Sequence, residues 1–306
     1  MLEPPSHEPG SWRGAGRVLV DYDTGEFWLT TRPRERPPKR GYAFEIYRSR
    51  DGESFSLVTS MSKEELSEAT GLRILSIEGQ QLLRDPSTGM YHLYLSIDNE
   101  GWPRQGWDTL LMVADDPRGP WKPYGLVIRR ELPFETAEAR DATIDIVDGR
   151  YVAIYKANSG GRVAMALAVS SDGKEWRKLG LLRVEGYEPP NYMLLYGRIL
   201  EGVQGPVFIG GETLHVVGGA AVTNTLAAYL VDLRERNLEL LSRGRWTPMS
   251  PYERSDYPIH SYVDMVYDPF RDRILIYVDT IDPKSGLELN QEVNRVLLYE
   301  VPLSQR

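Results

Sequence analysis

Short runs of apolar, β-branched and aromatic residues alternate along this chain with turns rich in Asp and Gly. Runs of this kind occupy 26–30, 90–95, 150–155, 213–217 and 273–278, and each follows such a turn. Strand-forming runs joined by short Asp/Gly turns predict β-hairpins. One helix is expected after Ser62, because Glu65 follows that serine at the spacing of a capping box. The fold class indicated is therefore all-β.

The hairpins recur at a nearly constant interval. The turn markers Asp23, Asp85, Asp148, Gly210 and Asp268 are 62, 63, 62 and 58 residues apart. Five units of about four strands each predict a five-bladed β-propeller that forms a single domain over 1–306. The expected blades are roughly 13–60, 74–125, 138–182, 198–247 and 258–303. A sandwich or barrel of similar hairpins is the alternative, and the constant spacing favours the propeller.

Composition narrows the classes of function. The absence of cysteine excludes thiolate catalysis, iron–sulfur clusters and cysteine zinc sites. The 36 Lys and Arg against 44 Asp and Glu give a net charge of -8, the reverse of the basic excess of nucleic-acid binders. No apolar run is long enough for a membrane span, and residues 1–13 lack the apolar stretch of a secretory signal. We expect a cytoplasmic protein, or a secreted one whose signal has been removed, without nucleic-acid or membrane partners.

In a propeller the innermost strand of each blade begins near the central funnel. Counting back seven residues from each turn marker gives Gly16, Glu78, Asp141, Val203 and Ser261. These positions are expected to form a ring around the funnel, and we call them the ring positions. Glu201 lies two residues before Val203, His260 precedes Ser261, and Arg13 and Arg140 stand close to the ring positions of blades one and three. Carboxylates at such positions are costly unless they are solvated, paired or functional. The sequence therefore predicts that Glu78, Asp141 and Glu201 converge on the funnel.

Converging carboxylates raise one another's pKa values, so that one can stay protonated while another is ionised. Glycoside hydrolysis needs this combination of an acid and a carboxylate on either side of a sugar. The alternative is structural, since strand-end acids also accept backbone N–H groups from the next blade. Trp12, Trp107 and Tyr192, in expected loops, are suited to stacking on a sugar, and Arg13, Arg140 and His260 are further candidate substrate-binding residues.

Three segments carry a family resemblance. The run 139–151, with Arg140 and Asp141, resembles the Arg/Lys-Asp-Pro strand of the five-bladed glycosidases of glycoside hydrolase families 43, 32 and 130. The run 114–121 is similar to an outer Gly-Pro-Trp strand of that clan, and 200–208 resembles the Glu-Gly-Pro strand that carries its general acid. The resemblance implies that Asp141 acts on the transition state or tunes the acid, and that Glu201 is the general acid.

The same comparison leaves the catalytic base open. Ala142 stands where the family usually has Pro, and Gly16 occupies the blade-one position of the base Asp. Glu78 is then the candidate base, unless phosphate or a water held by Arg13 replaces it. These residues predict an exo-acting glycoside hydrolase or phosphorylase acting on a small carbohydrate or oligosaccharide.

Two other classes remain as alternatives: a non-catalytic glycan-binding propeller, and a calcium-dependent lactonase or lyase-like propeller. No cofactor is expected. The resemblance leaves open a structural Ca2+ with His260 in its shell, as in some family 43 members.

Overall fold

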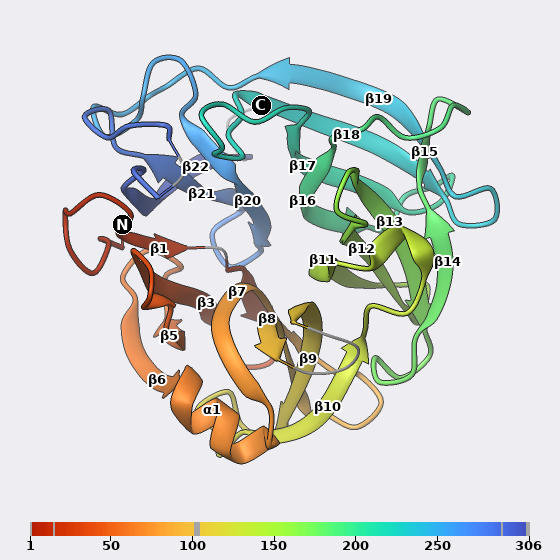
Figure 1. Cartoon of the computed structure of the whole chain (residues 1–306), viewed down its shortest axis with the longest axis horizontal. Coiled ribbons are helices and arrows are strands. Elements are labelled where there is room, and N and C mark those ends of the chain that lie inside the picture. Colours follow the sequence, from red (N-terminus) through yellow and green to blue (C-terminus); the bar gives the residue numbers. More distant parts are fainter. Residues whose placement is uncertain (1, 15, 101–104, 289, 304–306) are drawn as a thin grey trace.

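The computed structural model describes residues 2–14, 16–100, 105–288 and 290–303. In these ranges almost every regular element is a strand, and the strands form groups around a central axis (Figure 1). Helix α1 (Lys63–Thr70) begins where the capping box predicts: Glu65 N donates to Ser62 Oγ, and Ser62 N donates to the Glu65 carboxylate. No helix among the described residues is long and apolar enough to cross a membrane.

The strands follow one another mainly as antiparallel hairpins. The first group holds β1 (Trp12–Gly14), β2 (Val18–Asp21), β3 (Glu26–Glu35), β4 (Arg40–Gly41), β5 (Ala43–Ser49) and β6 (Ser56–Ser62). The second group holds β7 (Arg73–Arg84), β8 (Tyr91–Glu100), β9 (Gly106–Ala114) and β10 (Lys122–Ile128). The 3-10 helix η1 (Pro133–Glu135) follows β10. The third group holds β11 (Glu138–Val147), β12 (Arg150–Asn158), β13 (Val163–Ser170) and β14 (Arg177–Leu181). After β15 (Arg183–Val184) come β16 (Leu194–Leu200), β17 (Val207–Thr213), β18 (Thr225–Asp232) and β19 (Asn237–Arg245), then β20 (Ile259–Asp268), β21 (Arg273–Ile281) and β22 (Asn294–Pro302).

The two ends of the chain meet in one sheet. Strand β1 pairs in parallel with β22, with Trp12 opposite Asn294, and Leu2 forms an antiparallel bridge to Val296. The last strand group is thereby joined to the first, which closes the ring of strands (Figure 1).

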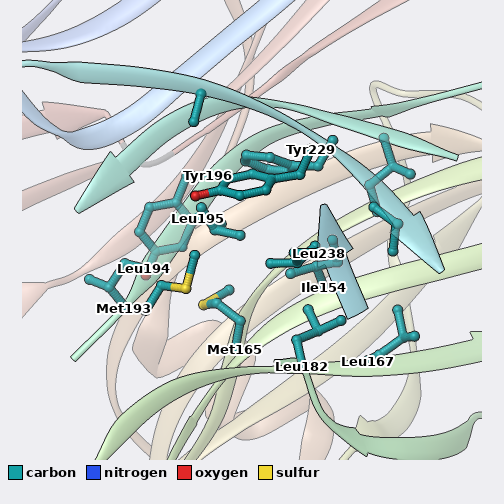
Figure 2. Packing of buried hydrophobic residues seen from close by; sticks show 14 of the residues in the cluster. Ile154, Met165, Leu167, Leu182, Met193, Leu194, Leu195, Tyr196, Tyr229 and Leu238 are labelled. Atoms are coloured by element: carbon teal, nitrogen blue, oxygen red, sulfur yellow. The ribbon is translucent and has the colours of Figure 1, made fainter. Parts of the chain in front are cut away.

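Apolar side chains fill the spaces between adjacent strand groups. The largest cluster lies where β12 and β13 face β16, β18 and β19, and Figure 2 shows part of it: Ile154, Met165, Leu167, Leu182, Met193, Leu194, Leu195, Tyr196, Tyr229 and Leu238. Strands with both faces covered in this way read as nearly continuous apolar runs. This explains why the β12 and β13 sequences show little alternation.

The innermost strands share an irregularity near their beginnings. The register shifts between Ile77 and Gln80 in β7, between Arg140 and Thr143 in β11, and between Ile259 and Val263 in β20. Extra residues at such bulges re-aim side chains. The predicted ring residues Glu78, Asp141 and Ser261 all lie at these bulges, and Asp141 and Ser261 have positive φ values of 51° and 56°.

In the first group, the innermost strand is interrupted at the corresponding place, between β1 and β2. Pairing with β3 runs from Gly14 opposite Arg32 in β1 to Val18 opposite Leu29 in β2. A Cβ atom on Gly16 would lie 1.6 Å from the carbonyl oxygen of Thr30, so only glycine fits there. The first group therefore offers no ring side chain at this position.

The turn assigned to Gly210 was wrong. Gly210 lies inside β17, paired with Gly197, and the β16–β17 turn is formed by 201–206, where Gly202 N donates to the carbonyl oxygen of Gly205. Two adjacent glycines usually indicate a turn, but Gly210 and Gly211 are needed here because neighbouring backbones approach closely at these positions. The seven-residue count consequently selected the wrong end of β16.

Charged side chains from several inner strands fill the axis below the bulges. Arg198 donates to both oxygens of Asp264, at 2.6 and 2.8 Å, and lies 3.3 Å from Asp145. Arg17 donates to Thr143 Oγ1 at 2.6 Å and to the carbonyl oxygen of Gly197. All four charges are buried, and each has a partner of the kind that burial requires. This plug separates the two mouths of the axis.

Candidate active site at one mouth of the axis

A cavity of about 180 Å³ lies at the mouth where the innermost strands begin. Its walls combine charged and aromatic side chains, and every strand group contributes at least one residue. The residues that line it are Trp12, Arg34, Glu78, Arg140, Asp141, Lys156, Tyr192, Leu194, Tyr196, Gly219, Ala220, Ala221, His260, Ser261, Tyr262 and Glu292. Larger depressions, of about 620, 500, 390 and 240 Å³, lie elsewhere on the molecule. The 180 Å³ cavity differs from them because three buried acids, Glu78, Asp141 and Glu292, line it together. We refer to the 180 Å³ cavity as the axial pocket.

Asp141 is held rigidly at the wall of the axial pocket. Its carboxylate accepts hydrogen bonds from Gly79 N at 3.1 Å and Tyr196 OH at 3.2 Å, and Arg140 lies 3.2 Å away. Its own backbone N–H donates to Ser96 Oγ at 2.8 Å. Gly79 N, Tyr196 OH and Arg140 therefore hold the Asp141 carboxylate in a fixed position at the wall of the pocket.

Glu78 is buried beside two arginines. It forms an ion pair with Arg32, and Arg34 lies 3.6 Å away. Burial alone would raise the pKa of Glu78, but the guanidinium groups of Arg32 and Arg34 outweigh it and hold the pKa at about 2. The expectation that the ring acids raise one another's pKa values is therefore wrong for Glu78, which is ionised and weakly basic.

This ion pair predicts a particular acid sensitivity. A carboxylate whose pKa is lower in the folded state stabilises the fold above its ordinary value of 4.5 and loses that contribution as the pH falls toward 2. Glu78→Gln should thus lower the free energy of unfolding by on the order of 3 kcal/mol at pH 7. The difference from wild type should shrink below pH 4.5, as measured by urea denaturation between pH 7 and 3.

The exposed Glu201→Gln variant is the control, since it should show no such pH-dependent difference. A destabilisation by Glu78→Gln that stays constant over the whole pH range would contradict the ion-pair explanation.

A second cluster of charges forms the neighbouring wall. Arg140 lies 3.0 Å and Lys156 lies 2.6 Å from the Glu138 carboxylate. Burial alone would raise the pKa of Glu138, but Arg140 and Lys156 hold it at about 2, while burial lowers the pKa of Lys156. Trp107 lies in β9 rather than in the expected loop, and its ring is 3.9 Å from the Arg140 guanidinium. It therefore supports Arg140 and does not line the axial pocket.

Aromatic rings and a histidine form the opposite wall. His260 packs at 4.0 Å from the Trp12 ring, and its Nε2 lies 3.6 Å from Glu292. Its Nδ1 is buried and has no hydrogen-bond partner among the described residues. Tyr196 and Tyr262 stack at 4.4 Å between His260 and Asp141. Glu292 thus orients the imidazole of His260, a group that commonly transfers protons in active sites.

Besides Trp107, two candidates from the sequence lie outside the axial pocket. Glu201 lies in the exposed β16–β17 turn and lines the 500 Å³ depression at the opposite mouth, beyond the Arg198 plug. A general acid must reach the same glycosidic oxygen that the other carboxylates surround, so Glu201 cannot act together with Asp141. Arg13 points to the other face of β1 from Trp12 and pairs with Glu45 at 3.0 Å. Strand alternation explains its absence from the pocket.

The axial pocket also contains residues that sequence reasoning missed. Arg34 and Lys156 stand on β3 and β12, the second strands of their groups, and Lys156 is directly opposite Arg140 in register. Lys156 could have been predicted from the hairpin, because it pairs across the β11–β12 turn with Arg140, which is next to a ring position. Glu292 comes from the loop before β22, and no spacing in the sequence marks it.

A structural Ca2+ beside His260 stays a prediction. Glu292 is a carboxylate paired with His260, and Ca2+ takes six to eight oxygen ligands in all. Within the described ranges, no group of three or more His, Asp or Glu side chains could hold a metal ion.

Comparison with known proteins identifies the fold but no sequence family. No family model matches the chain, and no curated protein matches it. Among solved structures, a thermostable family-43 glycoside hydrolase is similar, with a TM-score of 0.67 at 13% identity, covering 98% of this chain and 96% of that chain. The β-1,2-mannobiose phosphorylase from Listeria innocua, in complex with β-1,2-mannobiose, gives 0.58 at 16% identity, covering 99% and 93%.

An N-acetylgalactosamine deacetylase from F. plautii, in complex with blood group B trisaccharide, gives a TM-score of 0.64 at 11% identity, covering 99% of this chain and 96% of that chain. The resemblance to the propeller glycosidase clan is thus confirmed at the level of the fold. The three proteins catalyse different reactions on this fold, so function must be argued from the site.

Proposed function

We propose that this protein is a five-bladed propeller enzyme that acts on carbohydrate, as an exo-acting glycoside hydrolase or phosphorylase. The observation that carries the proposal is the axial pocket. It is a small polar cavity in which the carboxyl groups of Asp141 and Glu78, three cationic side chains and several aromatic rings face one another. Sugars are recognised by such combinations, because their hydroxyl groups need hydrogen-bond partners and their faces pack on aromatic rings.

The dimensions of the pocket support exo action. Its volume of about 180 Å³ lies below the ~300–1,000 Å³ typical of sites for drug-sized ligands. Buried Arg198, Asp264 and Asp145 block the axis beneath it. A blind pocket of this size takes one terminal sugar unit and leaves the remainder of a glycan outside.

Asp141 has the geometry of a charge stabiliser. An oxocarbenium-like transition state places positive charge at the anomeric carbon. A carboxylate that Gly79 N and Tyr196 OH hold in place meets that charge without having to reorganise. Glu78, with its pKa near 2, is a poor base and instead accepts hydrogen bonds from the sugar or positions Arg34.

With Glu201 at the opposite mouth, another group must protonate the leaving oxygen. His260 is the candidate, because it lies in the axial pocket, pairs with Glu292 and has an unpartnered Nδ1. Arg34 and Lys156 could hold either a water or a phosphate for attack on the anomeric carbon. Hydrolysis and phosphorolysis are therefore both chemically accessible.

A glycan-binding propeller without chemistry is the second candidate. The low pKa of Glu78 and the side-chain-free position at Gly16 favour it, because both leave the site without a strong carboxylate base.

The proposal predicts turnover of a glycoside. The purified protein should release the aglycone from at least one member of a panel of aryl glycosides, assayed with and without phosphate. A dependence on phosphate would identify a phosphorylase, and turnover without phosphate a hydrolase. Binding of sugars without turnover of any substrate in the panel would favour the glycan-binding alternative.

A further inference from the structure

Four arginines gather in one depression on the outer surface, away from the axial pocket. Arg150 begins β12, Arg177 begins β14, and Arg234 and Arg236 belong to the turn between β18 and β19. The depression has a volume of about 390 Å³, and its other lining residues are Val169, Leu179 and Leu233. No acidic residue is among the described residues that line it. We call these four residues the arginine cluster.

The members of the arginine cluster have no carboxylate partners. Within the described part of the chain, no ion pair shorter than 4.0 Å includes any of the four. Some exposed arginines do pair, as Arg73 does with Glu100 at 2.6 Å, whereas others, such as Arg50 and Arg245, have no ion pair among the described residues. The cluster differs from these single arginines because four of them line one hollow on a chain with a net charge of -8.

The local backbone keeps one of these arginines in a fixed place. Arg236 has a left-handed backbone with φ of 53°, a conformation in which glycine or asparagine is favoured. Its Nη1 donates to the carbonyl oxygen of Leu179 at 3.3 Å. A Cβ atom on Gly180 would lie 2.6 Å from that Nη1, so the glycine makes room for the guanidinium. Arg236 also lines a second depression of about 240 Å³ together with Arg183.

The cluster joins two neighbouring strand groups. Arg150 and Arg177 belong to the group of β11–β14, and Arg234 and Arg236 to that of β16–β19, with β15 pairing alongside β19 (Figure 1). A ligand bound here would contact both groups at once. Guanidinium groups converging from separate strands match the oxygen atoms of carboxylate, sulfate or phosphate.

We infer that the arginine cluster is a second binding site, for an anionic group carried by a glycan: a sulfated or uronate-containing chain. The negative charge of the whole protein disfavours nucleic acid. The glycan part of this inference rests on the proposed function, whereas the anion site stands on the arginines themselves.

Affinity electrophoresis tests this site. Wild-type protein should be retarded in gels containing dextran sulfate or polygalacturonate and should migrate freely in neutral dextran. The Arg177→Gln/Arg234→Gln double variant should bind these polymers about tenfold more weakly, because two exposed ion pairs with the polymer are lost. The matched control Arg73→Gln/Arg118→Gln makes the same change in charge at paired arginines and should bind as the wild type does.

Several results would overturn the inference. Equal binding by the double variant and wild type would show that the arginine cluster does not bind these polymers. An equal loss of binding in the control variant would show that only the net charge of the protein matters. Retention of a DNA duplex as strong as that of dextran sulfate, or saturation of the site by free inorganic phosphate or sulfate, would contradict a glycan-borne anion. Turnover of small aryl glycosides should be unchanged in the double variant, which separates this test from that of the axial pocket.

Discussion

Asp141→Asn is expected to lower kcat by a factor of about 10²–10³, which leaves no turnover in an ordinary assay. The asparagine keeps the shape of the side chain and can still accept from Gly79 N or Tyr196 OH, so the fold should be retained. What is lost is the negative charge that faces the anomeric carbon. The measurement is steady-state kinetics on the best substrate of the wild type, with circular dichroism to confirm folding.

The matched control is Glu201→Gln, which makes the same change from carboxylate to amide at the opposite mouth of the axis. Its kcat should stay within about twofold of wild type, since surface substitutions away from a site have small effects. Normal activity in Asp141→Asn would refute the assignment of Asp141. Loss of activity in Glu201→Gln would support the role of Glu201 as general acid, which the family resemblance implies.

His260→Gln is expected to lower kcat by a factor of about 10²–10⁴ for substrates with poor leaving groups, the usual contribution of general acid catalysis. Glycosides of 2,4-dinitrophenol should lose much less, because their leaving group departs without a proton. Comparing kcat for an alkyl glycoside and a dinitrophenyl glycoside in wild type and variant measures the difference.

The exposed His215→Gln variant serves as control and should keep both rates. Equal losses for the two substrates in His260→Gln would show that His260 binds the sugar or supports the fold without donating the proton. Glu292→Gln should show a weaker form of the same dependence on leaving group, since Glu292 acts by orienting His260.

The sequence predicted much of the fold because its turns are chemically explicit. Three of the five turn markers lie in turns between paired strands, Asp268 ends β20 directly before such a turn, and the capping box at Ser62 begins the helix. Counting seven residues back from a true turn reached the bulges that hold Glu78, Asp141 and Ser261, because β7, β11 and β20 deviate from regular pairing at equivalent positions. The count failed at Gly210, a glycine needed for close strand approach rather than for a turn.

The composition of the axial pocket was harder to predict than its position. Arg13 and Trp12 are adjacent in β1, and only the pairing with β3 decides which of them faces the axis. Lys156 comes from a second strand and Glu292 from a loop, so neither belongs to a periodic pattern. The pKa of Glu78 depends on Arg32 and Arg34, which belong to β3 in another strand group, so no pattern near Glu78 in the sequence indicates them.

The measurement that tests the central claim most directly is a time course of products from a reducing-end-labelled oligosaccharide, run with wild type and Asp141→Asn. The blind axial pocket predicts that the wild type removes single sugar units from the unlabelled end, so that the labelled chain shortens by one unit at a time, and that the variant leaves it intact. Early appearance of internal fragments, or equal degradation by the variant, would contradict an exo-acting site built around Asp141.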